Sequence, residues 1–294
     1  MAQVWRCTGL RWGVEGPVLG WGGGRTSALS WGKRVAFAVV DGGVRTCVGA
    51  RGNNCPVRAV VSGRSVGAQC EECARLERTH SVAADTVADD PRPYHVYLAW
   101  FGSGMVKVGI TAVERGEARL LEQGAVVFSW LGRGPLMAAR RSEELLRTAL
   151  GVPDRIAYDA KRAVRGALPE AAVRAGEVEA LHAKAVGLGG WPEALERMPF
   201  VAADHAGVFG LDGLPPAVGV VSELVAGGVV WGELVAAAGP DLHLAGERGV
   251  VVLDTRLMKG WELSAAGERE PADAVTMPVR EFGGLQGGMQ DGLF

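Results

Sequence analysis

Apolar and polar residues alternate most clearly between residues 94 and 150. Two runs rich in aromatic and β-branched residues, 94–101 and 105–110, flank the short break Gly102-Ser103-Gly104. Strand-like runs joined by a short glycine-containing loop are typical of a β-hairpin. We therefore expect two antiparallel strands in this part of the chain.

A helix, a third strand and a second helix are predicted after this hairpin. Thr111 and Glu114 have the spacing of a capping box, which predicts a helix over residues 113–123. The apolar run 126–130 predicts a strand. The amphipathic segment 135–150 predicts a helix that starts at a proline and stops at a glycine.

The flanking regions predict smaller elements. Residues 1–46 place tryptophans between glycine turns, which favours a small sheet packed by these rings, with stacking on nucleic-acid bases as the alternative. A helix is expected from Pro169 through Lys184, and a short one after Trp191-Pro192. Residues 201–264 return to short apolar runs, which indicate a small β-rich or mixed domain.

The order hairpin, helix, strand, helix resembles the core of the GIY-YIG nuclease superfamily. On that resemblance Tyr97 matches the tyrosine of the first strand, and Lys107-Val108-Gly109 stands at the Tyr-x-Gly of the second. Arg119 matches the arginine of the first helix, and Glu143 matches the metal-binding glutamate of the later helix. The runs KVGIT and EARLLEQGA are also similar to an uncharacterised bacterial family, whose members join a cysteine-rich zinc segment to such a core.

The resemblance covers roughly residues 45–155, and two positions depart from the pattern of the superfamily. Lys107 replaces the second tyrosine. A lysine can donate to a phosphate, but it lacks the phenol. Arg115 is a rival to Arg119 for the position of the arginine.

The resemblance implies metal-dependent hydrolysis of phosphodiester bonds. Such a reaction needs positive charge on the developing phosphorane, which a divalent metal and an arginine can supply. Mg²⁺ or Mn²⁺ would be held by Glu143, and Arg119 would clamp the phosphate. Tyr97 or a nearby group would orient the water, and Lys107 would assist the phosphate. Helical geometry favours Glu143, at the border of the apolar face, over Glu144, which points towards solvent.

Four of the five cysteines cluster in one stretch and predict a structural zinc site. Cys70 and Cys73 form a C-x-x-C, and Cys47 and Cys55 would complete a tetrahedral set of thiolates with no open position. His80 is an alternative ligand. The isolated Cys7 is interpreted as a small apolar residue.

The net charge of −2 hides an asymmetry. Residues 1–165 carry 23 basic and 15 acidic side chains, a net +8, whereas residues 166–294 carry 8 and 18, a net −10. A basic half suits a polyanion, and we expect nucleic acid as the partner, with DNA favoured over RNA. Solvated helix faces are the other interpretation of these charges. The candidate substrate-binding residues are Arg115, Arg140, Arg141 and Arg147.

The C-terminal residues Gln290, Leu293 and Phe294 resemble the peptide that docks on the bacterial sliding clamp. Such a tail would link the protein to replication or DNA repair, and chance occurrence of so short a pattern is the alternative. The sequence carries no secretory signal and no apolar run long enough for a membrane span, which predicts a cytoplasmic protein with no membrane partner.

Together these patterns predict an α+β chain. The expected units are a β-rich zinc-binding module (1–90), a GIY-YIG-like core (91–165), a helical segment with a small β-rich domain (166–264) and a flexible tail (265–294). The favoured function is a metal-dependent endonuclease. A degenerate nucleic-acid-binding protein of the same fold and a protein that only binds protein partners are the alternatives.

Overall fold

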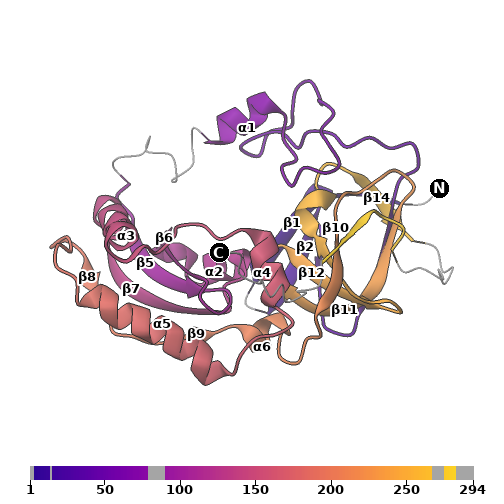
Figure 1. Cartoon of the computed structure of the whole chain (residues 1–294). Coiled ribbons are helices and arrows are strands. Elements are labelled where there is room, and N and C mark those ends of the chain that lie inside the picture. The colour runs from indigo at the N-terminus through magenta and orange to yellow at the C-terminus, as the bar shows by residue number, and fades with distance from the viewer. Residues whose placement is uncertain (1–2, 14, 79–89, 267–274, 283–294) are drawn as a thin grey trace, which may run out of the picture.

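The computed structural model describes residues 3–13, 15–78, 90–266 and 275–282, and it has an α+β fold built on two sheets (Figure 1). The predicted α+β class is therefore confirmed. The helices are α1 (Glu71–Arg78), α2 (Ala118–Gln123), α3 (Leu136–Leu150), α4 (Tyr158–Val164), α5 (Ala171–Val186) and α6 (Ala206–Phe209), with 3-10 turns η1 (Gly22–Gly24), η2 (Val113–Arg115) and η3 (Thr255–Met258).

The larger sheet joins the two ends of the described chain. Its strands are β1 (Val4–Gly13), β2 (Gly16–Trp21), β3 (Thr26–Ala28), β4 (Arg34–Val39), β10 (Ala217–Val221), β11 (Val229–Ala238), β12 (Asp241–Gly246), β13 (Gly249–Asp254), β14 (Glu262–Ala265) and β15 (Val279–Glu281). Within the described residues they run in the order β15-β10-β13-β12-β11-β4-β14-β1-β2-β3. Strands from the first and third predicted units thus share one sheet, with β4 between β11 and β14.

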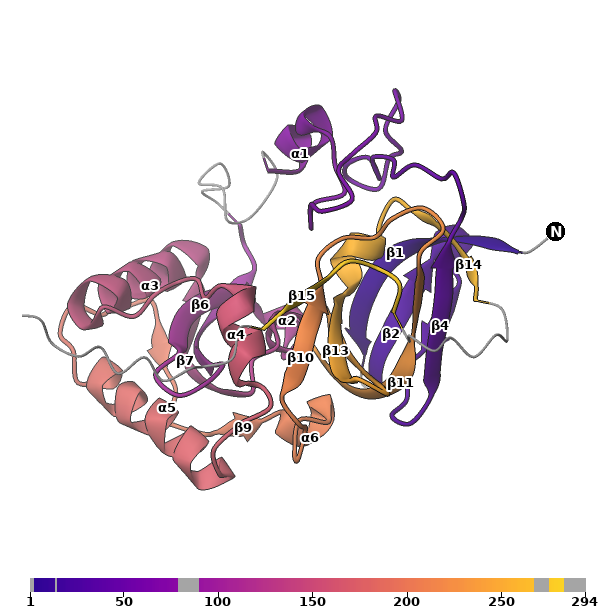
Figure 2. The same cartoon turned by 45° about the vertical axis from the view of Figure 1, so that its right-hand side comes forward.

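The smaller sheet lies on the other side of the molecule, and Figure 2 shows α4 between the two sheets. Its strands are β5 (Pro93–Trp100), β6 (Val106–Ala112), β7 (Val127–Pro135), β8 (Glu196–Arg197) and β9 (Ala203–Asp204). On one face, Leu98 and Trp100 join the main apolar core together with residues of α3 and α5. On the other face, Tyr97 and Phe101 form a smaller core with Leu120 of α2.

The local predictions around this sheet are confirmed except at two places. The hairpin β5–β6 and the helix α3 form where expected, and α3 ends at Gly151 with φ of 65°. The helix expected over 113–123 is instead a 3-10 turn and a short α-helix separated at Gly116, which has φ of 47°. Thr111 pairs with His95 inside the hairpin, so the capping box does not form. Strand pairing of the backbone here replaces the local cap.

The second departure follows Trp191-Pro192. The chain there makes a turn and then the strand β8, rather than the expected short helix. Gly132 explains the change, because its backbone packs directly under Leu195 and pairs with Arg197. The close backbone approach at a glycine thus favours sheet extension over a helix.

A buried cluster of ion pairs joins α4 to the larger sheet. The Asp241 carboxylate is fully buried and accepts hydrogen bonds from Arg162 Nη2 at 2.6 Å and from Arg165 Nη1 at 2.6 Å. Arg162 Nη2 also donates to Asp254 at 2.7 Å. Burial alone would raise the pKa of Asp241, but the charges of Arg165 and Arg162 hold it below its usual range.

We expect Asp241→Asn to destabilise the fold by about 3–5 kcal/mol, because it removes the carboxylate that pairs with the buried Arg165 and leaves Arg162 with only Asp254 and the exposed Asp159. Since the pKa of Asp241 is depressed, its stabilisation is present above the unfolded pKa of about 3.9 and is lost as the pH falls. Urea unfolding at neutral pH measures the effect. Asp159→Asn is the matched control, because Asp159 pairs with Arg162 from an exposed position and should cost no more than about 1 kcal/mol. Equal effects of the two variants would contradict the prediction.

Candidate functional site

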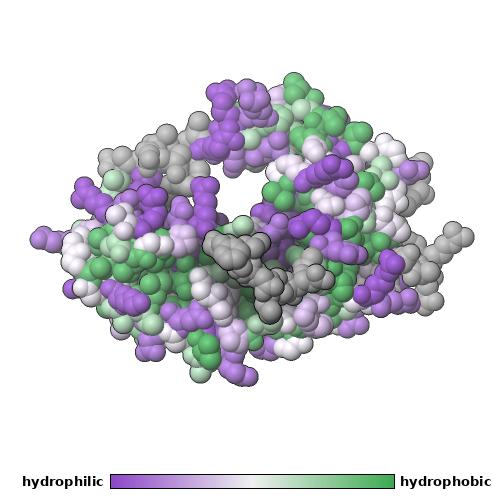
Figure 3. Space-filling model, viewed as in Figure 1, coloured by the Kyte–Doolittle hydropathy of each residue, from purple (hydrophilic) through white to green (hydrophobic). Residues whose placement is uncertain are grey.

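A cleft of about 960 Å³ opens along the Tyr97 face of the smaller sheet. In Figure 3 hydrophilic residues border the central hollow of this side of the molecule. The residues that line the cleft come from β5, β6, α2, α3, α4 and the loops beside them: Arg92, Tyr94, Tyr97, Lys107, Gly109, Ile110, Thr111, Ala112, Arg115, Arg119, Glu122, Gln123, Arg140, Glu143, Glu144, Asp154, Arg155, Ile156, Tyr158 and Lys161. All four predicted catalytic residues are in this set.

Tyr97 lies at the floor of the cleft, and its position depends on Gly109. The two residues are direct partners across the hairpin. A Cβ at position 109 would come within 2.4 Å of the Tyr97 hydroxyl, so only glycine leaves room for the ring. Gln123 Nε2 donates to the hydroxyl at 2.9 Å. Burial raises the pKa of Tyr97, while the bond from Gln123 and the charge of Arg119 lower it.

Lys107 lies beside Tyr97 and is largely buried. Its Nζ donates to the backbone oxygen of Asp154 at 3.1 Å and lies 5.8 Å from the centre of the Tyr97 ring. Burial and the charge of Arg119 lower the pKa of Lys107 to about 8, against the opposing charge of Glu143. The cleft therefore contains an amine whose proton is held less tightly than in an ordinary lysine.

Glu143 is half-buried on α3 and faces the same cleft. Burial raises the pKa of Glu143, and the charge of Lys107 counteracts this. Glu144 is exposed, as its predicted direction requires. It accepts hydrogen bonds from Arg147 Nε at 2.9 Å and Thr148 Oγ1 at 3.1 Å, although it also reaches the cleft lining. The two neighbouring carboxylates thus occupy different environments.

Arg115 and Arg119 both reach the cleft and are equally exposed. Arg115 Nη2 pairs with Glu122 at 2.6 Å, whereas Arg119 Nη1 lies 4.0 Å from the same carboxylate. Arg119 also acts on the pKa of both Tyr97 and Lys107. Arg119 is therefore the arginine that interacts with the centre of the cleft.

The remaining candidate arginines divide into two groups. Arg140 lines the cleft, whereas Arg141 and Arg147 are exposed on α3 and lie outside the described lining. Arg162 and Arg165, which also contributed to the basic charge of the first half, are buried in the ion-pair cluster with Asp241. The basic charge of this region thus includes structural residues as well as cleft residues.

Gln123, Tyr158 and Lys161 also line the cleft, although no sequence motif marks them as site residues. Lys161 Nζ donates to the backbone oxygen of Gln123 at 3.0 Å and lies 4.5 Å from the centre of the Tyr158 ring. Burial and the charge of Arg165 lower the pKa of Lys161 to about 7. Because Gln123 also holds Tyr97, these residues form one connected group. Their separation along the chain hides it from any motif.

The four predicted cysteine ligands come together in the segment between β4 and the end of α1. The sulfur atoms of Cys47, Cys55, Cys70 and Cys73 all lie within 4.8 Å of one another. Tetrahedral zinc–thiolate bonds of about 2.3 Å place ligand sulfurs about 3.8 Å apart, so the set suits a metal ion such as zinc. The amides of Gly49 and Cys70 donate to Cys47 Sγ, as they would to a thiolate.

Arg45 connects this cysteine segment to the larger sheet. Its buried guanidinium donates to the backbone oxygens of Ser62 and Ser65 within the segment, and to those of Arg256 and Lys259 at η3. The Arg45 side chain therefore holds the cysteine segment against η3 of the larger sheet region. Cys7 is buried apart from the four cysteines, in the main core.

Other sequence expectations have simpler outcomes. His205 contacts the Ala125 oxygen through Nδ1 at 3.0 Å and Glu117 through Nε2 at 3.3 Å. His80 and the tail residues Gln290, Leu293 and Phe294 lie outside the described residues. Among the described helices, none combines the length and apolar character that crossing a bilayer requires.

We expect the purified protein to contain a bound metal such as zinc and Cys70→Ser to lose it, because a missing thiolate opens the tetrahedral shell. Elemental analysis of the protein measures the metal, and the thermal unfolding temperature should fall with it. Cys7→Ser is the control and should retain the metal. Equal metal content in both variants would contradict the assignment of Cys70 as a metal ligand.

Comparisons with known proteins place the chain in a family. A family model with the description Protein of unknown function (DUF2797) matches residues 32–263, which is more than half of the chain. The matched region includes the four cysteines and the whole cleft. No curated protein and no solved structure matches the chain. The chain therefore belongs to the DUF2797 family.

Proposed function

We propose that the protein is a metal-dependent endonuclease that hydrolyses phosphodiester bonds of nucleic acid, with DNA favoured, in the cytoplasm. One observation carries the proposal. The resemblance to GIY-YIG nucleases singles out four residues on four different elements, and all of them line one cleft: Tyr97, Lys107, Arg119 and Glu143.

The charge of the cleft suits a phosphate backbone. Seven of its lining residues are Arg or Lys and four are Asp or Glu. In the proposed complex, Arg119 contacts the scissile phosphate, while Arg115 and Arg140 hold the flanking phosphates. Cationic groups fixed in a cleft stabilise the charge that develops on the phosphate in the transition state.

Glu143 is the carboxylate that fits a divalent metal. It is half-buried beside Lys107, and Mg²⁺ retains several waters, so one or two protein carboxylates are enough to hold it. When bound, the metal would supply positive charge at the phosphate. Glu143 would serve this role in its ionised form, which the charge of Lys107 favours.

Tyr97 and Lys107 are proposed to act on protons at the centre of the cleft. The raised pKa of Tyr97 keeps its phenol protonated at neutral pH, and Gln123 fixes the hydroxyl that would orient the attacking water. The pKa of Lys107, lowered to about 8, makes its ammonium a better proton donor to the leaving oxygen than an ordinary lysine.

A structural role is proposed for zinc in the cysteine segment. Four thiolates would complete its coordination and leave no position for a substrate. Arg45 would then transmit the ordering of this segment to η3 through its four backbone acceptors.

Nucleic-acid binding without cleavage is the second candidate, and Lys107 is the observation that favours it. A lysine in place of the second tyrosine keeps the attraction for phosphate but removes a phenol. Such a protein would still bind polyanions with an affinity that falls steeply as salt rises. The tail residues Gln290, Leu293 and Phe294 are proposed to recruit either form to the bacterial sliding clamp.

We expect Glu143→Gln to reduce cleavage at least about 100-fold, because it removes the charge that holds the metal. Labelled single-stranded, duplex, flap and branched DNA and RNA, with Mg²⁺ or Mn²⁺, provide the measurement. Glu144→Gln is the matched control and should cut normally. Unchanged cleavage by Glu143→Gln would show that Glu143 is not the ligand of a catalytic metal. Salt-sensitive binding with no cleavage by the unaltered protein would establish the second candidate.

Arg119→Ala should reduce cleavage more than Arg115→Ala, because Arg119 interacts with Tyr97 and Lys107 whereas Arg115 is paired with Glu122. A difference of about 10-fold or more in kcat/KM is expected from the loss of a charge-assisted contact in the transition state. The opposite order would assign the phosphate clamp to Arg115.

A further inference from the structure

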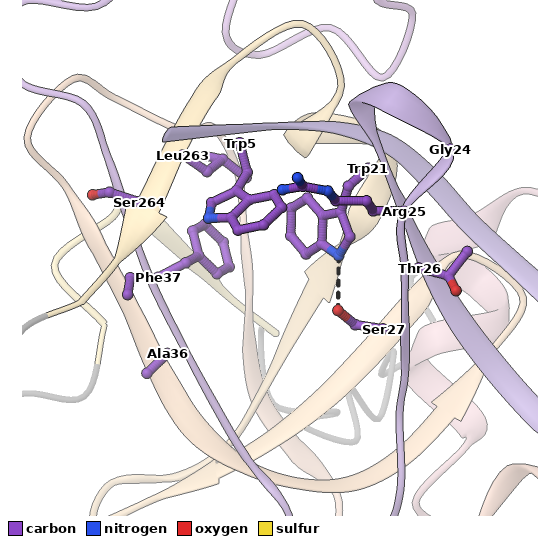
Figure 4. Close-up of a pocket in the computed structure, with 11 residues that line it drawn as sticks. Trp5, Trp21, Gly24, Arg25, Thr26, Ser27, Ala36, Phe37, Leu263 and Ser264 are labelled. Atoms are coloured by element: carbon purple, nitrogen blue, oxygen red, sulfur yellow. Dashed lines mark hydrogen bonds between the residues drawn. The ribbon is translucent and has the colours of Figure 1, made fainter. Parts of the chain in front are cut away.

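A second pocket, of about 550 Å³, lies on the larger sheet and is lined by aromatic rings. Figure 4 shows Trp5 and Trp21 beside each other, with the guanidinium of Arg25 next to them and the Phe37 ring below. The ring centres of Trp5 and Trp21 are 6.3 Å apart, and the rings are tilted by 58°. Strands β4, β14, β1, β2 and β3, which are successive neighbours in the sheet, all contribute to the lining.

The two indoles and Arg25 are held in place by local contacts. Trp21 Nε1 donates to Ser27 Oγ at 2.8 Å, and the Arg25 guanidinium lies 4.9 Å from the centre of the Trp5 ring. Gly23 and Gly24 both have φ of 76°, a conformation that lets the chain turn between β2 and β3 and bring Arg25 back over Trp5. Both tryptophans are only half-buried, so aromatic surface remains accessible.

The chemistry of the lining selects a planar, anionic ligand. Among the described residues that line the pocket, Arg25 is the one charged side chain, and the Ser27 hydroxyl is the one that Figure 4 shows facing the two indoles. A cationic ligand is disfavoured, because Arg25 already lies on the Trp5 ring and no carboxylate lines the pocket. A hydrocarbon chain would cover the guanidinium of Arg25 without offering it a hydrogen-bond acceptor.

The net charge of the N-terminal segment that carries both tryptophans favours a strand of nucleic acid as the source of such a ligand. Residues 1–46 carry six Lys or Arg and two Asp or Glu, and Arg11, Lys33 and Arg34 are exposed there. Bases stack on accessible aromatic side chains while basic groups follow the phosphates, which is the usual combination in single-strand binding.

We propose that this pocket binds a base of single-stranded nucleic acid against Trp5 and Trp21, with the adjoining phosphate beside Arg25. The pocket is separate from the cleft and shares no lining residue with it. It adds a contact for unpaired nucleotides that does not require cleavage in the cleft. Its accessible indoles provide an optical signal for binding.

The test is a fluorescence titration of the full-length protein with oligothymidylate of about 10 nucleotides, without added Mg²⁺. Binding should quench tryptophan emission. Trp5→Leu, which keeps an apolar side chain, should weaken binding by about 5- to 100-fold and remove part of the quenching. Trp31→Leu is the matched control, because Trp31 is exposed and lies outside the pocket lining. It should bind normally.

Arg25→Gln provides a second variant on an exposed side chain, in case Trp5→Leu affects folding. It should weaken binding and lower the slope of log affinity against log salt by about 1, as expected for one phosphate contact. An oligomer of the same length with base-free sugars should bind more weakly than oligothymidylate. These results together support the pocket.

Four results would overturn the proposal. The first is that both pocket variants bind oligothymidylate as tightly as the unaltered protein. The second and third are that the base-free oligomer or thymidine monophosphate binds as tightly as oligothymidylate. The fourth is that a polyproline peptide quenches the tryptophan emission and oligothymidylate does not. A strand held by the cleft alone would lose affinity in Arg115→Ala and keep it in Trp5→Leu. The binding titration therefore tests the pocket, and the cleavage assay tests the proposed nuclease, so either proposal can fail without the other.

Discussion

The buried ion-pair cluster around Asp241 is the constraint on which the arrangement of the two sheets depends. It holds Arg162 of α4 and Arg165, which directly follows α4, against Asp241 of β12 and Asp254 of β13. Charged groups buried in this way are tolerated only when they are paired. Tyr158 and Lys161 of the same helix line the cleft, and the Arg162 guanidinium lies 5.5 Å from the centre of the Tyr158 ring. The larger sheet, although it contributes no residue to the cleft lining, thereby positions one of its walls.

A close backbone contact complements these ion pairs. Gly124 ends α2 and Gly239 forms the turn between β11 and β12, and a Cβ on either would approach the backbone of the other segment within about 3.1 Å. Trp12 Nε1 of β1, in the same sheet as this turn, donates to the Gly239 oxygen at 2.9 Å and supports the turn. Gln123, immediately before Gly124, bonds Tyr97, so the packing of the two sheets extends to the centre of the cleft.

The cysteine segment and the tryptophan pocket lie at different parts of this frame. Arg45 secures the cysteine segment to η3, next to the end of β13 that carries Asp254. The tryptophan pocket uses the other end of the same sheet, near the edge strand β3. A cysteine cluster that suits a metal ion, a charged cleft and an aromatic pocket are thus combined on one framework.

The sequence by itself determined the hairpin, α3, α5 and the set of four cysteines, because periodicity, helix ends and ligand chemistry are local properties. The resemblance to a known family, rather than energetics, singled out four residues that line one cleft: Tyr97, Lys107, Arg119 and Glu143. Thr111 was misjudged because pairing with His95 overrides a local capping signal. Only the tertiary structure decided that β4 pairs with β11, that Arg162 and Arg165 are structural, and that Gln123 and Lys161 belong to the cleft. Those outcomes depend on contacts between residues far apart in the chain, and no local pattern encodes them.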